Sequence, residues 1–183
     1  MLRMTVEGVG FDHKQNTVVV LKDWEGKKLL PIWIGPNEAR AIALELENAR
    51  PQRPLSHDLL LQCVQLTGGR VSRVVINDLQ EATFYATIDV DTETGMHHID
   101  ARPSDAIALA VRAKCPVFVD GDALKALVDL KDVRPIEGGY EVRADADAPE
   151  PEKEAAEDEA TPETQESEIA RFKRLIGELD LQE

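Results

Sequence analysis

The sequence predicts an α/β (α+β) protein, a single compact domain with a mixed, largely antiparallel sheet and packed helices. Three observations support this prediction. Short runs of alternating or β-branched apolar residues open the chain and recur after residue 70. Two stretches with helical apolar spacing separate these runs, and a third stretch follows them. After residue 143 the composition changes abruptly to acidic residues, alanine and proline, so we expect the domain to occupy residues 1–143.

The strands are predicted from apolar runs bounded by turn residues. These runs cover residues 2–6, 16–21, 28–34, 71–79, 82–90, 96–101 and 116–119. Pro31 cannot donate a ladder hydrogen bond, so we expect its strand at a sheet edge or at a bulge. The run 116–119 is short and apolar, which is typical of a central strand. One last short strand is expected within residues 134–142.

Three helices are predicted from their start signals and apolar stripes. Pro36 suits the first position of a helix. The apolar stripe of that helix is Ala39, Ile42, Ala43 and Leu46. Ser56 and Ser104 are the predicted N-caps of two further helices, and Gly68 ends the first of these two. A brief helix is expected over residues 122–128.

Most of the negative charge lies in one segment near the end of the chain. The chain has 35 acidic and 21 basic residues, and residues 144–168 alone hold eleven acidic residues and one lysine. Residues 144–167 contain no aromatic residue and no aliphatic residue larger than alanine, so we predict a disordered acidic linker. Residues 168–183 then have an apolar helical face, which predicts a short amphipathic helix. That face consists of Ile169, Phe172, Ile176 and Leu179.

Several classes of protein are not expected. No apolar run approaches the roughly 20 residues of a membrane span, and the first residues lack a secretory signal pattern. The only two cysteines, Cys63 and Cys115, fit a reducing cytoplasm and are predicted to pack as small apolar side chains. The sequence also lacks the phosphate-loop, dinucleotide-binding, zinc-protease and esterase motifs. We therefore expect a cytoplasmic protein with no membrane partner.

Two segments concentrate functional groups at the start of a predicted helix. Residues 53–58 read Arg-Pro-Leu-Ser-His-Asp, and residues 102–105 read Arg-Pro-Ser-Asp. Backbone N–H groups at a helix start attract anions, and carboxylates hold hard divalent cations. Phosphodiester hydrolysis needs both of these, together with arginine to balance phosphate charge. We expect folding to bring the two segments to a common, solvent-open cleft.

Each side chain has a role in this hypothesis. The candidate ligands of a divalent metal, Mg²⁺ or Mn²⁺, are Asp58, Asp100, Asp105 and Glu38. The candidate phosphate ligands are Arg53 and Arg102. His57 is the candidate general acid or base. The candidate catalytic set is His57, Asp58, Arg102 and Asp105.

The same residues have structural alternatives. Asp58 and Asp105 stand where a carboxylate favours the helix dipole without any catalysis. His57 can equally be a partly buried histidine that is satisfied by backbone groups. Arg102 and Arg53 can be structural partners of Asp100 and Asp58.

Several short segments of the domain form a joint signature in a fixed order. They are residues 30–35 (LPIWIG), 38–39 (EA), 41–44 (AIAL), 53–59 (RPLSHDL), 84–86 (FYA), 101–110 (ARPSDAIALA) and 116–119 (PVFV). Together they resemble the bifunctional nuclease family of bacteria and plants, over about residues 2–125. The resemblance implies a compact α/β domain that forms homo-oligomers and acts on DNA and RNA. It carries over to the motif positions His57, Asp58, Asp100, Arg102 and Asp105.

We therefore expect a nuclease of low sequence specificity that hydrolyses phosphodiester bonds of DNA and RNA and depends on a divalent metal. The alternative is a non-enzymatic oligomeric scaffold or regulatory ligand-binding domain, in which the same motifs cap helices and line an interface. The mildly acidic composition of residues 1–143 favours this alternative, because nucleases usually have a positive groove. A third possibility is that the acidic linker mimics nucleic acid and covers the site of its own chain or of a neighbour.

Overall fold

The computed structural model of the chain describes residues 1–12, 14–49, 51–130, 133–136 and 139–142. All of them lie within Met1–Glu150, the first of two units into which the chain divides. The predicted linker 144–167 and the predicted helix 168–183 lie outside the described residues, so both stay predictions.

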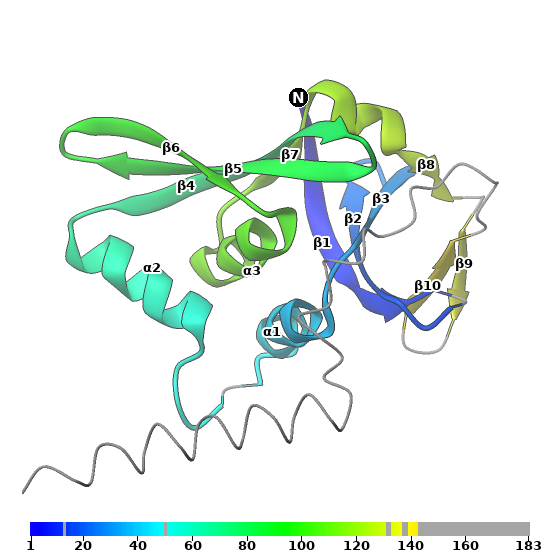
Figure 1. The fold of residues 1–183 in the computed structure, drawn as a ribbon, viewed down its shortest axis with the longest axis horizontal. Helices are drawn as coiled ribbons and strands as arrows, with labels where there is room; N and C mark the ends of the chain where they lie inside the picture. Colours follow the sequence, from blue (N-terminus) through cyan, green and yellow to red (C-terminus); the bar gives the residue numbers. More distant parts are fainter. Residues whose placement is uncertain (13, 50, 131–132, 137–138, 143–183) are drawn as a thin grey trace, which may run out of the picture. The chain divides into compact units, whose positions relative to one another are not determined.

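Within the described residues, eight strands form one mixed sheet in the order β6-β5-β4-β7-β1-β2-β3-β8 (Figure 1). The strands are β1 (Leu2–Phe11), β2 (Thr17–Asp23), β3 (Lys28–Trp33), β4 (Arg70–Gln80), β5 (Thr83–Thr92), β6 (Gly95–Ala101), β7 (Val117–Val119) and β8 (Val128–Asp129). Neighbouring strands run antiparallel except β4 and β7, which run parallel. The predicted fold class, with a mixed and largely antiparallel sheet, is confirmed.

The described helices α1 (Pro36–Leu46), α2 (Ser56–Leu66) and α3 (Pro103–Ala113) pack on the same face of the sheet (Figure 1). Alternating alanines make α3 narrow, so it packs closely on the sheet, and seven of its residues are buried. By contrast, α2 has no fully buried residue, and its leucines 59, 60 and 66 are exposed. None of the described helices is both long and apolar enough to cross a membrane.

The main core lies between the three helices and the sheet. Its largest fully buried side chains include Leu21, Leu30, Ile42, Ile76 and Ile107. Successive residues of β2 point to opposite faces, so Val18 and Val20 belong to a smaller cluster with Leu29. This arrangement explains why residues 16–21 form a continuous apolar run, because both faces of β2 are buried.

Several predicted features of the strands are confirmed. In the described part of the chain β3 pairs with β8 only at Lys28 and Leu29, so Pro31 lies where β3 is the edge strand. The short run 116–119 contains the central strand β7, which lies between β4 and β1.

Other boundaries differ from the prediction. Ala82 is not a strand residue, because the two-residue turn between β4 and β5 places Glu81 and Ala82 at positive φ, 46° and 71°. Residues 134–142 contribute to two strands, β9 (Val133–Ile136) and β10 (Gly139–Val142), which pair antiparallel. The brief helix is the 3₁₀ helix η1 (Gly121–Ala126), and the chain then enters β8.

The two cysteines have different environments. Cys115 is half-buried, and burial raises the pKa of its thiol to about 11, as expected for a small apolar side chain. Cys63 is exposed, so its predicted packing is wrong. It lies on α2, which packs against α3 but has no fully buried residue.

Candidate functional site

The first turns of the three helices meet at one cleft of about 450 Å³. Helix α1 contributes Asn37, Glu38, Arg40, Ala41 and Leu44; the start of α2 contributes Leu55, Ser56 and His57; and the start of α3 contributes Arg102 and Asp105. The cleft therefore joins segments that are about 20 and 45 residues apart in the sequence. The expectation that the two Arg-Pro segments share a cleft is confirmed for His57 and Arg102.

Local sequence explains where these helices begin. Proline occupies the first turn of both α1 and α3, where its restricted φ suits a helix and its missing N–H costs nothing. The N-cap residues Gly35 and Arg102 are extended and make no side-chain cap hydrogen bond. The predicted caps Ser56 and Ser104 lie instead inside the first turns, and Leu55 is the N-cap of α2. The helix dipoles are positive at this end, and each first turn also carries an acidic residue, Glu38, Asp58 or Asp105.

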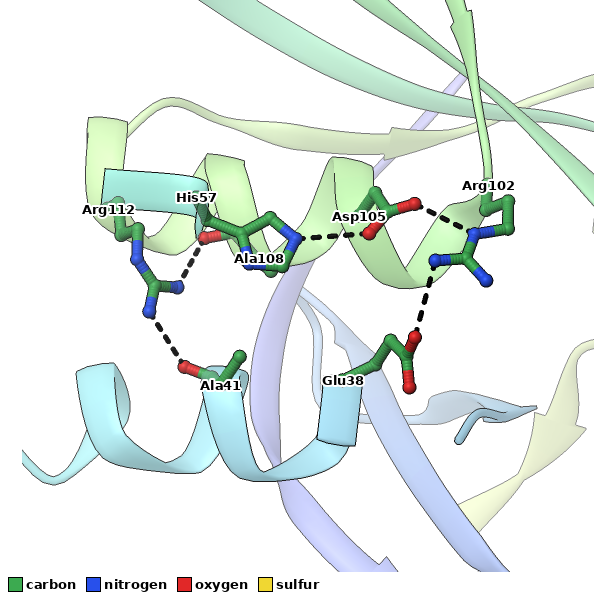
Figure 2. A network of polar contacts seen from close by, with 7 residues as sticks. All are labelled: Glu38, Ala41, His57, Arg102, Asp105, Ala108 and Arg112. Atoms are coloured by element: carbon green, nitrogen blue, oxygen red, sulfur yellow. Dashed lines mark hydrogen bonds and ion pairs between the residues drawn. The ribbon is translucent and has the colours of Figure 1, made fainter. Parts of the chain in front are cut away.

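A chain of polar contacts crosses the cleft from α2 through α3 to α1 (Figure 2). The Nε2 atom of His57 lies 3.0 Å from Oδ1 of Asp105, and Nε of Arg102 donates to Oδ2 of the same carboxylate at 2.8 Å. A second guanidinium nitrogen of Arg102 donates to Oε1 of Glu38 at 3.2 Å. One arginine thus holds two carboxylates from different helices, and one of them also holds the histidine.

Burial and charge act in opposite directions on Asp105. Partial burial raises the pKa of its carboxyl group, but hydrogen bonds and charge from Arg102 and His57 outweigh this and hold the pKa below its ordinary value. Asp105 is therefore anionic at neutral pH. Because an ionised carboxylate only accepts hydrogen bonds, Nε2 of His57 is the protonated ring nitrogen, and in the neutral ring Nδ1 is left as a base.

Asp58 takes part in a different set of contacts beside the cleft. Its carboxylate accepts the backbone N–H of Leu55 at 2.7 Å and pairs with Nε of Arg112 at 2.6 Å. The Arg112 side chain is only 4% exposed, and it also donates to the carbonyl oxygens of Ala108 and Ala41 (Figure 2). This Arg112 bridge (Asp58, Arg112 and the two carbonyls) ties α1, α2 and α3 together. These contacts stabilise the start of α2 and the packing of the helices, so they agree with a structural role for Asp58 at the helix start.

The remaining predicted residues lie elsewhere. Arg53 is exposed before α2 and is not among the described residues that line the cleft. Asp100 is exposed on β6, where it is in register with Thr87 of β5. Of the four candidate metal ligands, Glu38 and Asp105 line the cleft. Within the described part of the chain, no group of three or more His, Cys, Asp or Glu side chains is placed to hold a metal ion.

The sequence reasoning missed two arginines. Arg112 is a basic residue in the last turn of α3, where a surface position was the simpler interpretation. Arg40 is exposed and lines the cleft on α1. One feature of the sequence could have indicated that α1 has a second face in contact with protein. Its apolar residues extend beyond the predicted stripe, to Ala41 and Leu44.

Comparison with known proteins places this site in a family. A family model described as "Bifunctional nuclease domain" matches residues 19–128, which include all ten residues that line the cleft. The chain belongs to the bifunctional nuclease domain family. The matched region of this bifunctional nuclease domain runs from β2 to the start of β8.

Two kinds of relative are similar to this bifunctional nuclease domain. An uncharacterized protein of Mycobacterium tuberculosis is 41% identical over 121 residues, which cover 66% of this chain and 72% of the relative. A protein of rice, Oryza sativa subsp. indica, named "Bifunctional nuclease 1", is 27% identical over 113 residues. That match covers 60% of this chain and 34% of the rice protein.

Proposed function

We propose that this chain is a nuclease of low sequence specificity, which hydrolyses phosphodiester bonds of DNA and RNA at the cleft where α1, α2 and α3 begin. The observation that carries the proposal is the pairing of His57 with Asp105, beside Arg102, in this cleft. The family membership supports nuclease activity, and the name of the rice relative agrees with it. The three helix starts favour an anionic ligand such as phosphate.

In the proposed reaction, His57 moves the proton. Its Nδ1 atom accepts a proton from a water molecule as the water oxygen attacks phosphorus. A new bond from phosphorus to the water oxygen forms, and the bond to the leaving sugar oxygen on the opposite side breaks. That oxygen takes a proton from solvent water, and the imidazolium releases its proton to solvent. Asp105 keeps the ring oriented and stabilises its positive form, because the lowered pKa of Asp105 keeps the carboxylate charged.

Low specificity follows from the kind of groups that line the polar end of the cleft. They are charged side chains and helix starts, which suit backbone phosphates, whereas sequence reading needs hydrogen bonds to base edges. Arg102 orders the carboxylates of Glu38 and Asp105 and adds positive charge beside them. The substrate proposed here is therefore the sugar-phosphate backbone of a nucleic acid.

The divalent metal is also part of the proposal. Mg²⁺ commonly binds through one or two carboxylates and keeps several waters, and Glu38 and Asp105 offer two carboxylates at one cleft. A bound ion would neutralise phosphate charge and acidify a coordinated water. Asp58 is not among the described residues that line the cleft, and its carboxylate binds Arg112 and the Leu55 amide, so we assign it to positioning the helices.

The test compares full-length protein with the variants His57→Gln and Asp105→Asn on DNA and RNA substrates. We expect each variant to lose about 100-fold or more in cleavage rate, because general acid–base catalysis contributes about that much. The matched control is His97→Gln, at an exposed histidine on β6 that contacts threonines outside the cleft. This control should cleave like wild type.

Two results would overturn the proposal. If His57→Gln cleaves at the wild-type rate, the activity does not come from this cleft. If Asp105→Asn lowers the melting temperature without lowering the rate, the cleft is structural and the scaffold alternative gains support.

Metal dependence is tested with EDTA, which should abolish cleavage, and with added Mg²⁺ or Mn²⁺, which should restore it. Undiminished activity in EDTA would remove the metal from the proposal.

A further inference from the structure

The charges in the cleft indicate a second cationic residue with its own role. Arg102 is paired with both Glu38 and Asp105, so its single positive charge faces two negative charges. Arg102, Glu38 and Asp105 together therefore carry one net negative charge at the polar end of the cleft. A phosphodiester is itself an anion, so without a bound metal ion this end needs a further cation to accept it.

Arg40 is placed to supply that cation. It lies on the cleft-facing side of α1 with Asn37, Ala41 and Leu44. Counted from Asn37, the other three follow at the helical spacing of three, four and seven residues. Its side chain is exposed, and within the described residues it has no hydrogen bond or ion pair. A guanidinium that is not paired with protein carboxylates can present parallel N–H donors to a phosphate.

The cleft also has apolar lining residues. Ala41 and Leu44 of α1 face it together with Leu55, the residue before α2. Along α1, Leu44 lies about 9 Å from Glu38, given the rise of about 1.5 Å per residue. The cleft therefore offers charged groups and, farther along α1, an apolar wall at Leu44. A nucleotide has the matching polarity, with an anionic phosphate at one end and the apolar face of a base at the other.

We propose that Arg40 anchors the phosphate of a single-stranded segment of DNA or RNA, whose base lies against Leu44 and Leu55. This inference rests on the proposed nuclease function and adds the form of the substrate. In a duplex each base face is covered by its stacked neighbours, so only an unpaired base can reach the apolar wall. The cleft volume of about 450 Å³ is that of a small-molecule site, which suits one nucleotide of the strand.

The binding experiment uses full-length protein in EDTA with a short fluorescent oligothymidylate, measured by anisotropy over a range of salt concentrations. We expect Arg40→Gln to weaken binding about 10-fold and to reduce the salt dependence, by about 0.7 in the logarithmic slope, for one lost phosphate contact. Arg40→Lys keeps the charge and should recover most of the affinity. The control Arg70→Gln removes the same charge at an exposed arginine of β4 outside the cleft, and it should bind like wild type.

Two further ligands test the role of the base. A duplex of the same length should bind at least 10-fold more weakly than the single strand. An abasic strand with the same number of phosphates should lose affinity, and Leu44→Ala should add little to that loss because the base contact is already absent.

The inference fails if Arg40→Gln binds like wild type, or if it weakens binding no more than Arg70→Gln. It also fails if the duplex or the abasic strand binds as tightly as the intact single strand. These binding results are separate from the cleavage test. Loss of affinity in Arg40→Gln, together with full cleavage by His57→Gln, would keep the phosphate anchor and reject the proposed catalytic role of His57.

Discussion

The carboxylate of Asp58 has two structural roles. It accepts a hydrogen bond from the backbone N–H of Leu55, and it is the counter-ion of the buried guanidinium of Arg112. Burial raises the pKa of Asp58, but these partners outweigh it and hold the pKa below its ordinary value of 3.8. An acid with a lowered pKa stabilises the folded state above its ordinary pKa, and this stability is lost as the pH falls through the lowered value.

We predict that Asp58→Asn lowers the free energy of unfolding by about 2 kcal/mol at pH 7, because it leaves a buried charge without its counter-ion. The difference from wild type should shrink as the pH falls from the ordinary pKa of 3.8 through the lowered pKa, because Asp58 of the unfolded chain binds its proton at a higher pH than folded Asp58 does. Urea unfolding at several pH values measures this. Asp91→Asn is the control, because its partner Arg70 is largely exposed and such pairs contribute little. A constant difference across this pH range would contradict the prediction.

At the residue scale, the sequence was sufficient to predict that His57, Arg102 and Asp105 lie at one cleft, because Arg-Pro, Ser and Asp at a helix start form a recognisable local pattern. The partners of these residues could not be predicted. Glu38 meets Arg102, and Arg112 meets Asp58, only because α1, α2 and α3 pack together. Contacts between helices depend on packing distances and angles, which the spacing within one helix does not contain.

At the scale of single elements, the hairpin between β4 and β5 has an unusual turn. A two-residue turn of this kind needs positive φ at both positions, and glycine or asparagine is the usual choice. Here the positions are Glu81 and Ala82, and the alanine has φ of 71°. A side chain with a Cβ atom pays for this conformation with steric energy, since the left-handed region is crowded for every residue except glycine.

We predict that Ala82→Gly raises the free energy of unfolding by about 0.5–1 kcal/mol, the steric relief being partly offset by the flexibility of glycine in the unfolded chain. Ala82→Val should have the opposite effect, since a β-branched residue is more strained at positive φ. Chemical denaturation of the three proteins measures both changes. Equal stability of wild type and Ala82→Gly would show that the turn carries no such strain.

The elements that could be predicted were those with a long periodic pattern. Apart from the three-residue β7, the predicted strands of the large sheet and the three helices have patterns of at least five residues, and the structure contains all of them. Elements at the margin were harder to predict, because β8 has two residues and β9 and β10 have four each. Such short strands have too few residues for periodicity, and their pairing depends on the elements beside them.

At the scale of the whole molecule, negative charge is concentrated in residues 144–168, which lie outside the described residues. We predict that a chain ending at residue 143 binds single-stranded DNA more tightly than the full chain at low salt, because a segment with eleven acidic residues and one lysine repels or mimics phosphate. The difference should vanish at high salt. Equal affinities at low salt would exclude an influence of the segment on binding.

The predicted homo-oligomer and cytoplasmic localisation stay predictions.

The Arg112 bridge has a consequence for how such proteins can diverge. Two of its hydrogen bonds are accepted by main-chain oxygens, those of Ala41 and Ala108. A substitution at either position leaves that oxygen in place, because every residue has a main-chain carbonyl group. The third contact ends on the carboxylate of Asp58, which only another acid could imitate. Substitutions at Asp58 and Arg112 should therefore occur together in related sequences. Positions 41 and 108 need only side chains small enough for their helices to stay in contact.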